Sequence, residues 1–365
     1  MLTAYRLDAT GLAVPLGMID DFQSMRFTRS YSGIGTWEMS ISAYSACMAR
    51  IRDMDILRIG HKRSGLVTSV RADGQADGSC QVTFSGVELK GMAARRIVCP
   101  PETESHLTVN AQVEAVMAEL IRSQLTEAIG ARQIPGIIAA YEAGGPKITY
   151  SGRYSPLQDD ITTLSEQYEI GWYADIENRG IAWHIYAGVD RRVGAPNNTL
   201  LLSYERGTIN TSSYSYTAQA ATTAITAGQG EGVDRSIYVA GNQAKGLHRI
   251  EIYVDARDID DAAMLPARGE QYLSQQGSET TYSLQGSHQL LKGYLSGDWD
   301  VGDRCTIRDQ RLLNGDLDSR VTEVTETYEQ GRMLLDLCVG YDKRKLEDVL
   351  RRNNSRTQAL INKEG

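Results

Sequence analysis

The chain has 365 residues, of which 41% are hydrophobic and 23% are charged, a globular composition that excludes an intrinsically disordered protein. Its formal net charge is −8, to which residues 342–365 contribute +3 and residues 1–341 contribute −11. Binding to a phosphate backbone depends on clustered cations, so this acidic body argues against a nucleic-acid-binding protein.

Hydrophobic runs are short throughout the chain. None approaches the roughly 18 apolar residues of a membrane-spanning helix, so we expect no membrane segment. The opening residues lack the basic region of a secretory signal, which predicts a protein made and assembled in the cytoplasm. Disulfides do not form readily in that reducing compartment, so we expect free thiols. No two cysteines stand at metal-ligand spacing, so we expect no metal site formed by them. The cysteines are Cys47, Cys80, Cys99, Cys305 and Cys338.

Residues 1–98 are predicted to form a small β-barrel or sandwich. Short runs of alternating polarity are separated by turn residues, and Cys80, Val82 and Phe84 fall on one face of their run. Gly33 and Gly35 stand between two such runs. For a turn there, we predict that at least one of the two glycines has a positive φ.

Residues 99–200 are predicted to form an α+β domain. Asn110 is the predicted cap of a first helix, and Ser155-Pro156 begins a second helix with Pro156 at its first helical position. A hairpin follows through residues 178–180. The predicted buried positions of these elements are Val113, Val116, Met117, Leu120, Ile121, Leu157, Ile161, Leu164, Tyr168, Ile181, Trp183 and Ile185.

Residues 201–341 are predicted to form a second β-rich domain with a short inserted helix within 258–276. Residues 209–230 contain no Asp, Glu, Lys or Arg, which is typical of a buried or partnered strand pair. Its tyrosines Tyr214 and Tyr216 are candidate interface residues. Residues 342–365 are predicted to form a charged helix or tail whose apolar edge, also a candidate interface, consists of Leu346, Val349 and Leu350.

An internal similarity links the two β-rich regions. Residues 67–70 (VTSV) and 321–324 (VTEV) each follow an Asp-led strand and precede a glycine by the same interval. Two related barrels would produce this pattern. The apolar faces of the strands that follow are out of phase, however. Val82 and Phe84 align with Asp336 and Cys338, and the apolar residues Leu335, Leu337 and Val339 fall opposite polar residues. Either a β-bulge shifts the register or the similarity is chance.

The sequence contains no convergent catalytic or metal-binding motif. The five histidines stand alone, without an HExxH or a His/Cys pair at ligand spacing, and no GxSxG elbow occurs. The carboxylate clusters at 20–21, 159–160 and 258–261 lack the remaining features of a glycosidase or Ca²⁺ site. We therefore predict no catalytic residue, no metal and no cofactor, and a protein that is not an enzyme.

Several segments resemble, in order and spacing, the siphovirus tail-hub or baseplate-hub family of tailed phages. They are SMRFTRSYSGIGTWEMSISAY, ILRIGHKRSGLVTSV, FSGVELKGMAARRIV, LSYERGTINTSSYSY, SIYVAG, WDVGDRCTIRD and VTEVTETYEQGRMLLDLCVG. Each motif is weak alone, but the set covers most of residues 20–341. The positions that carry the resemblance as structural motifs are Gly33, Gly35, Trp37, Gly302 and Asp303.

The resemblance implies an α+β, predominantly β chain with two small barrel-like domains and inserted α+β elements. It implies a homotrimer at the tail tip of the virion, assembled in the host bacterial cytoplasm. Its partners would be distal tail and tail-tube proteins and tail-tip or receptor-binding proteins, with DNA only in transit through the lumen. Two alternatives remain open: a tail-associated peptidoglycan-cleaving enzyme that uses two carboxylates, and a host-glycan-binding module.

Overall fold

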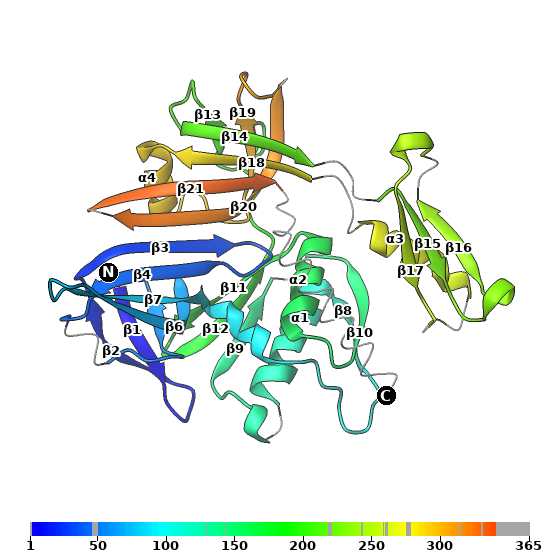
Figure 1. Cartoon of the computed structure of the whole chain (residues 1–365), viewed down its shortest axis with the longest axis horizontal. Helices are drawn as coiled ribbons and strands as arrows, with labels where there is room; N and C mark the ends of the chain where they lie inside the picture. Colours follow the sequence, from blue (N-terminus) through cyan, green and yellow to red (C-terminus); the bar gives the residue numbers. More distant parts are fainter. Residues whose placement is uncertain are drawn as a thin grey trace. The chain divides into compact units, whose positions relative to one another are not determined.

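The structure is a computed structural model of the chain (Figure 1). The residues that it describes are 2–45, 50–128, 130–142, 144–217, 221–241, 244–257, 259, 262–274, 279–313, 315–329 and 331–340. The predicted C-terminal helix, with Leu346, Val349 and Leu350, lies outside them. No helix within the described part of the chain is long and apolar enough to cross a membrane.

The chain divides into two compact units. Unit 1 comprises residues 1–212 and 283–339, and unit 2 comprises residues 213–282 and 340–365. The predicted domains 1–98, 99–200 and 201–341 stay predictions.

One large sheet dominates the fold. Its strands follow the order β14-β18-β21-β20-β3-β4-β7-β6-β5-β1-β2, and β19 joins β13 to β20 beside this path. They are β1 (Leu2–Leu7), β2 (Ala13–Ile19), β3 (Phe22–Ser30), β4 (Thr36–Ser42), β5 (Ile56–Arg58), β6 (Ser64–Gly74), β7 (Cys80–Glu88), β13 (Leu201–Ser203), β14 (Ile209–Thr217), β18 (Glu279–Gly286), β19 (Arg304–Arg308), β20 (Asp316–Glu329) and β21 (Arg332–Gly340).

The chain is therefore α+β and predominantly β, as the sequence predicted. Between the described strands, no pairing closes the sheet path, so the two closed barrel-like domains stay a prediction. In β7, Val82 and Phe84 are buried, and Cys80 on the same face is half-buried, which confirms the predicted face.

The predicted α+β segment packs beside this sheet in unit 1 (Figure 1). Its strands form a two-stranded sheet, β10-β8, and a three-stranded sheet, β11-β12-β9. The elements are β8 (Leu107–Gln112), α1 (Val113–Ile121), β9 (Ile137–Tyr141), β10 (Lys147–Gly152), α2 (Leu157–Tyr168), β11 (Gly171–Glu177) and β12 (Gly180–Tyr186). All twelve predicted buried positions are buried except Tyr168, which is half-buried against the same core.

Both predicted helix caps are wrong. Asn110 lies in β8, and Gln112 is the N-cap of α1 without a side-chain cap. Pro156 is the N-cap of α2 instead of its first helical residue, and the Ser155 hydroxyl donates to Asp160 instead of accepting from a backbone N–H group of the helix. In both cases a strand or a loop that packs against the core continues up to the helix, so tertiary contacts replace the local cap.

Unit 2 contains a small sheet covered by one helix. Its order is β16-β15-β17, with β15 (Thr223–Ala227), β16 (Ile237–Gly241) and β17 (Glu251–Asp255), and helix α3 (Leu265–Ser274) packs on β15 and β16. The predicted helix within 258–276 is thus confirmed. The remaining helices are α4 (His288–Ser296) in unit 1 and the short turns η1 (Leu89–Arg95), η2 (Arg122–Thr126), η3 (Gly130–Arg132), η4 (Gly232–Asp234), η5 (Gly246–His248) and η6 (Ala262–Met264).

The large sheet contains the same strand order twice. The first repeat has the order β3-β4-β7-β6-β5-β1, and the second has β14-β18-β21-β20-β19-β13. Taken in chain order, each strand of one repeat has a counterpart at the same place in the other. The repeats differ at one end, because β1 is antiparallel to β5 whereas β13 is parallel to β19.

Candidate functional site

An aspartate turn occurs at the same place in both repeats. The N–H group of Val67 donates to the Asp55 carbonyl at 2.9 Å, and that of Val321 donates to the Asp303 carbonyl at 2.9 Å. In return, the two valine carbonyls accept from Met54 and Gly302, residues that both have a positive φ, 68° and 95°. Gly302 and Asp303, predicted as a structural motif, therefore form one of two equivalent turns.

The side chains of the two aspartates also have equivalent roles. Each is buried and accepts the backbone N–H group of the residue three positions earlier, Arg52 for Asp55 and Asp300 for Asp303. Each also pairs with an arginine, Asp55 with Arg6 at 2.7 Å and Asp303 with Arg191 at 2.6 Å. In both repeats the hydrogen bond and the ion pair satisfy the buried carboxylate and fix the turn.

Residues 67–70 and 321–324 occupy equivalent places in the two repeats, and each segment contains a bulge. The register shifts between Val67 and Ser69 in β6, and between Val321 and Glu323 in β20. Beyond the bulges, Val70 pairs with Phe84 and Val324 pairs with Leu337. Phe84 thus corresponds to Leu337, one position away from the alignment of the sequences. Because both repeats contain the bulge, the bulge does not cause this difference. It comes from the connections that follow, residues 75–79 between β6 and β7 and residues 330–331 between β20 and β21.

The turn that contains Gly33 and Gly35 differs from the prediction. Neither glycine has a positive φ. Gly35 is required for another reason, because an added Cβ would lie 1.9 Å from the Thr28 carbonyl oxygen. Its N–H group donates to the buried Glu88 carboxylate at 2.7 Å. Close approach of two backbone segments, not a left-handed conformation, explains the glycine.

Trp37, also predicted as a motif residue, is buried in β4 and donates its indole N–H group to the Leu66 carbonyl at 3.2 Å. Its ring occupies the space that Cβ atoms at Gly65 and Gly86 would fill. The indole therefore lies across three adjacent strands and aligns them. No chemistry beyond packing and one hydrogen bond follows from this position.

A basic turn between β5 and β6 enters a cluster of buried carboxylates that sequence patterns did not indicate. Lys62 pairs with Asp300 at 3.0 Å, and Arg63 pairs with Glu326 at 2.8 Å. Arg58, just before the turn, pairs with the fully buried Asp175 of β11 at 3.0 Å. The turn thus connects the first repeat, the second repeat and the α+β segment.

Two carboxylates of this cluster, Asp300 and Asp175, have a lowered pKa. Burial raises the pKa of Asp300, but the Arg29 and Lys62 cations outweigh it and hold that pKa at about 2. Burial likewise raises the pKa of Asp175, but hydrogen bonds from Arg58 and Ser64 lower it by more, so the net pKa is below the ordinary value. A glycosidase acid requires a raised pKa, so neither group has the character of a general acid.

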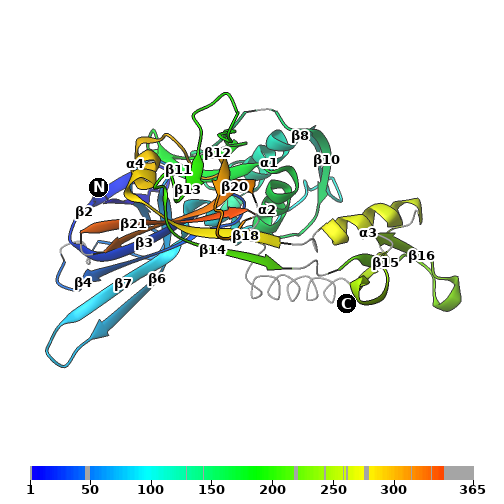
Figure 2. The same cartoon turned by 90° about the horizontal axis from the view of Figure 1, so that it is seen from above.

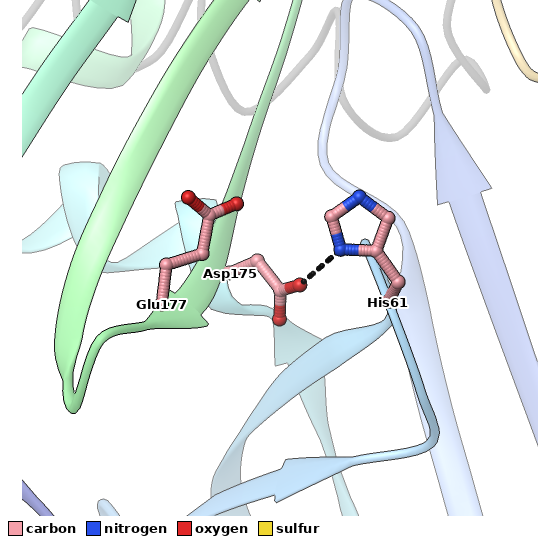
Figure 3. A group of neighbouring side chains, drawn as sticks. All are labelled: His61, Asp175 and Glu177. Atoms are coloured by element: carbon pink, nitrogen blue, oxygen red, sulfur yellow. Dashed lines mark ion pairs between the residues drawn. The ribbon is translucent and has the colours of Figure 1, made fainter.

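Three side chains in this region have the composition of a metal site, His61, Asp175 and Glu177, with ligand atoms within 4.8 Å of one another (Figure 3). The Asp175 oxygens already accept hydrogen bonds from Arg58, Ser64 and two backbone N–H groups. Glu177 pairs with His184 at 3.0 Å. Because the central carboxylate has its lone pairs engaged by protein donors, the arrangement fits an ion-pair network better than a metal centre.

The remaining candidates offer no convergent chemistry. A shallow groove of about 740 Å³ lies between β8, α1 and β9, but its charged lining residues Glu119, Arg122 and Glu127 pair with one another. Asp159 and Asp160 lie in the first turn of α2, as predicted, and Asp160 accepts from Tyr150 and Ser155. Of the cluster 258–261, only residue 259 is described.

The predicted interface tyrosines lie in β14, the terminal strand of the large sheet. Tyr214 is 41% exposed, and of Tyr216 only its place in the strand is described. A second strand edge is free in the first repeat. Residues 69–74 of β6 pair with β7 on one side, and no described residue pairs with them on the other.

Comparison with known proteins gives a family and a fold. Residues 15–341 match the family described as Siphovirus ReqiPepy6 Gp37-like protein. Among curated proteins, none matches the sequence.

Three solved structures share the fold. A 43 kDa tail protein of prophage MuSo2 from Shewanella oneidensis is 14% identical, with a TM-score of 0.58 over 93% of this chain and 97% of that one. A tail protein from Neisseria meningitidis MC58 is 15% identical, with a TM-score of 0.55 and the same coverage. Prophage tail protein gp18 from Listeria monocytogenes is 10% identical, with a TM-score of 0.52 over 97% and 98% of the two chains.

Proposed function

The chain belongs to the Siphovirus ReqiPepy6 Gp37-like family of siphovirus tail proteins, and from this premise we propose that it is the structural hub of a tail tip or baseplate. In this role it closes or extends the tail tube, connects the tube to tip proteins and leaves a channel for DNA. It acts within the virion, without catalysis and without a cofactor.

The observation that carries this proposal is the repeated strand order of the large sheet. Two similar β units in each chain, present in three chains, offer six similar faces. Such a ring of near six-fold symmetry matches the end of a six-fold tube while its outer parts keep three-fold symmetry. We therefore propose a homotrimer whose two β units are barrel-like. A closed ring uses heterologous contacts, so each β unit must offer two different surfaces.

The charge of the chain supports a channel through which DNA moves. Residues 1–341 carry a net charge of −11. Like charges on the lumen and on DNA prevent the strand from adhering during transit. The distal tail and tail-tube proteins would bind one face of the ring, and tail-tip or receptor-binding proteins would bind the other.

Negative-stain electron microscopy of the purified chain, at increasing concentration and on isolated tails, tests the proposal. We expect rings with a central hole, and antibody labelling at the tail tip. Labelling along the tube or on the capsid, or a chain that stays a single copy in both settings, would contradict it.

The two alternatives make different predictions. A peptidoglycan-cleaving enzyme would clear a zymogram, and a glycan-binding module would retain ligands on a glycan array. We expect neither result. A glycosidase acid needs a raised pKa, whereas Asp175 and Asp300 are paired with cations that lower theirs.

A further inference from the structure

Besides the ion pairs of the basic turn, a strand pairing joins the two repeats within one chain. In β20, residues 323–329 pair antiparallel with β3, from Glu323 with Ser30 to Glu329 with Ser24. The Tyr31 N–H group extends this ladder by donating to the Thr322 carbonyl at 2.8 Å. Thr28 and Thr325, directly opposite each other, also share a side-chain hydrogen bond of 2.9 Å.

The same edge of the first repeat lacks that partner. The counterpart of β20 is β6, whose residues 64–66 pair with β5 just as residues 316–320 of β20 pair with β19. After the bulge, β20 meets β3, whereas residues 69–74 of β6 meet no described strand on that side. Figure 2 shows β6 and β7 extending as a hairpin beyond the neighbouring strands. Residues 68–72 are exposed, including Val70 at 49%.

The second repeat has the complementary free edge. The counterpart of β3 is β14, which ends the sheet path with β18 as its one described neighbour in that path. Its sequence, INTSSYSYT, contains no charged residue and no proline, the residues that natural edge strands use to prevent pairing. An edge of this composition is suited to a partner strand.

We infer that β14 of one copy pairs antiparallel with residues 69–74 of β6 in the next copy, and so repeats between chains the β3–β20 pairing found within each chain. This inference rests on the proposed ring and identifies the surface that closes it. Because β14 belongs to the second repeat and β6 to the first, the contact is heterologous and propagates around a ring. Around the ring, β3–β20 pairings within a chain would alternate with β14–β6 pairings between chains. Every β unit would then form the same kind of strand pairing on each of its two sides.

Disulfide scanning between two forms of the full-length chain tests the pairing. In a background where the native cysteines are replaced by Ala or Ser, one form carries R71C or A72C in β6. The other form carries a cysteine at one of residues 212–215 in β14. Directly opposite residues bring their Cβ atoms within about 4.5–5.5 Å, close enough for a disulfide after a small adjustment.

We expect a covalent dimer for one or two positions of the scan, spaced as the strand register requires, and none for the others. With both cysteines in one chain, we expect a ladder that stops at the covalent trimer. The matched control is V14C in β2, the strand at the opposite end of the sheet path, which is exposed but has no counterpart that pairs between repeats. It should not cross-link with β14.

Hydrogen exchange on the wild-type chain gives a second readout that needs no substitution. Amides of residues 69–74 should exchange at least tenfold more slowly in the ring than in the single copy. Rings that form without cross-links or protection at these residues, or with equal cross-linking to V14C, would overturn the pairing and leave the hub proposal intact. A chain that forms no ring in solution or on tails would overturn both.

Discussion

The two repeats of the large sheet have the same strand order, yet their equivalent strands lie in different surroundings. Val324 in β20 is fully buried, whereas its counterpart Val70 in β6 is 49% exposed. The backbone bulge before each valine is the same, so the local structure does not cause the difference. The cause is the neighbour, because β3 lies beside β20 and no described strand lies beside that part of β6.

The repeats also differ in what connects equivalent strands. A tight turn with Gly33 and Gly35 joins β3 to β4, whereas residues 218–278, most of unit 2, separate β14 from β18. The connection between these two strands can therefore hold a long insertion while both strands remain in the large sheet. A duplicated β unit can thus acquire a new surface without changing its strand order.

The largest difference between the repeats should appear at Glu326 of β20. This fully buried carboxylate pairs with Arg63 and accepts from Tyr294 at 2.9 Å, so E326A leaves an unpaired buried cation. We expect a loss of about 3–5 kcal/mol in the free energy of unfolding. Urea denaturation measures it. The matched control is the counterpart substitution A72E in the exposed part of β6, which should cost under about 0.5 kcal/mol. Equal losses would show that the two strands share one environment.

The tight turn of the first repeat should be sensitive to any added side chain at Gly35. Because its Cβ would lie 1.9 Å from the Thr28 carbonyl oxygen, we expect G35V to lose about 1–3 kcal/mol of stability. G33A is the matched control, since its nearest contact is the Ser30 hydroxyl at 3.3 Å. Thermal unfolding compares the two. If G35V has the same melting temperature as the wild type, the backbone of β3 does not approach Gly35 as closely as the structure shows.

The valine pair tests burial directly. V324T places a hydroxyl group in a fully buried position and should cost about 1–2 kcal/mol, because the group has to be desolvated. V70T in the single copy should change stability by less than about 0.5 kcal/mol. Chemical denaturation at low protein concentration measures both. A cost at Val70 as large as that at Val324 would mean that β6 is covered even in the isolated chain.

The smallest expected effect is on the pH dependence of stability. It concerns the residue three positions before each turn aspartate. Asp300 of the second repeat, where the first repeat has Arg52, has a pKa of about 2 in the folded chain, below the value of about 3.9 in unfolded chains. Its pairing therefore stabilises the fold above about pH 4, and this contribution is lost as the pH falls toward 2.

We expect D300N to be less stable than the wild type at pH 7. Between pH 4 and pH 2, its free energy of unfolding should fall by about 1 kcal/mol less than that of the wild type. Urea titrations at each pH measure the slope. D73N, at a surface position of β6, is the matched control and should follow the wild type. Parallel curves for D300N and the wild type would show that Asp300 does not contribute to the acid sensitivity.

Much of the local structure follows from the sequence pattern. The stripes of α1 and α2 and the faces of β7 and β12 were predicted from period and alternation, because burial of one face imposes that spacing. The family could also be predicted from the order of weak motifs, and the match over residues 15–341 confirms it. The helix caps failed, since packing against the core replaced the local signals.

The sequence by itself determined the family, the predominantly β class and the faces of most elements, since each depends on residues close together in the chain. Only the tertiary structure decided that the VTSV and VTEV segments are equivalent, because their equivalence is visible only in the pairings with neighbouring strands. It also decided which carboxylates pair with which cations. Asp175, Asp300 and Glu326 converge on one basic turn from three separate regions of the chain, and no spacing in a sequence encodes a meeting of that kind.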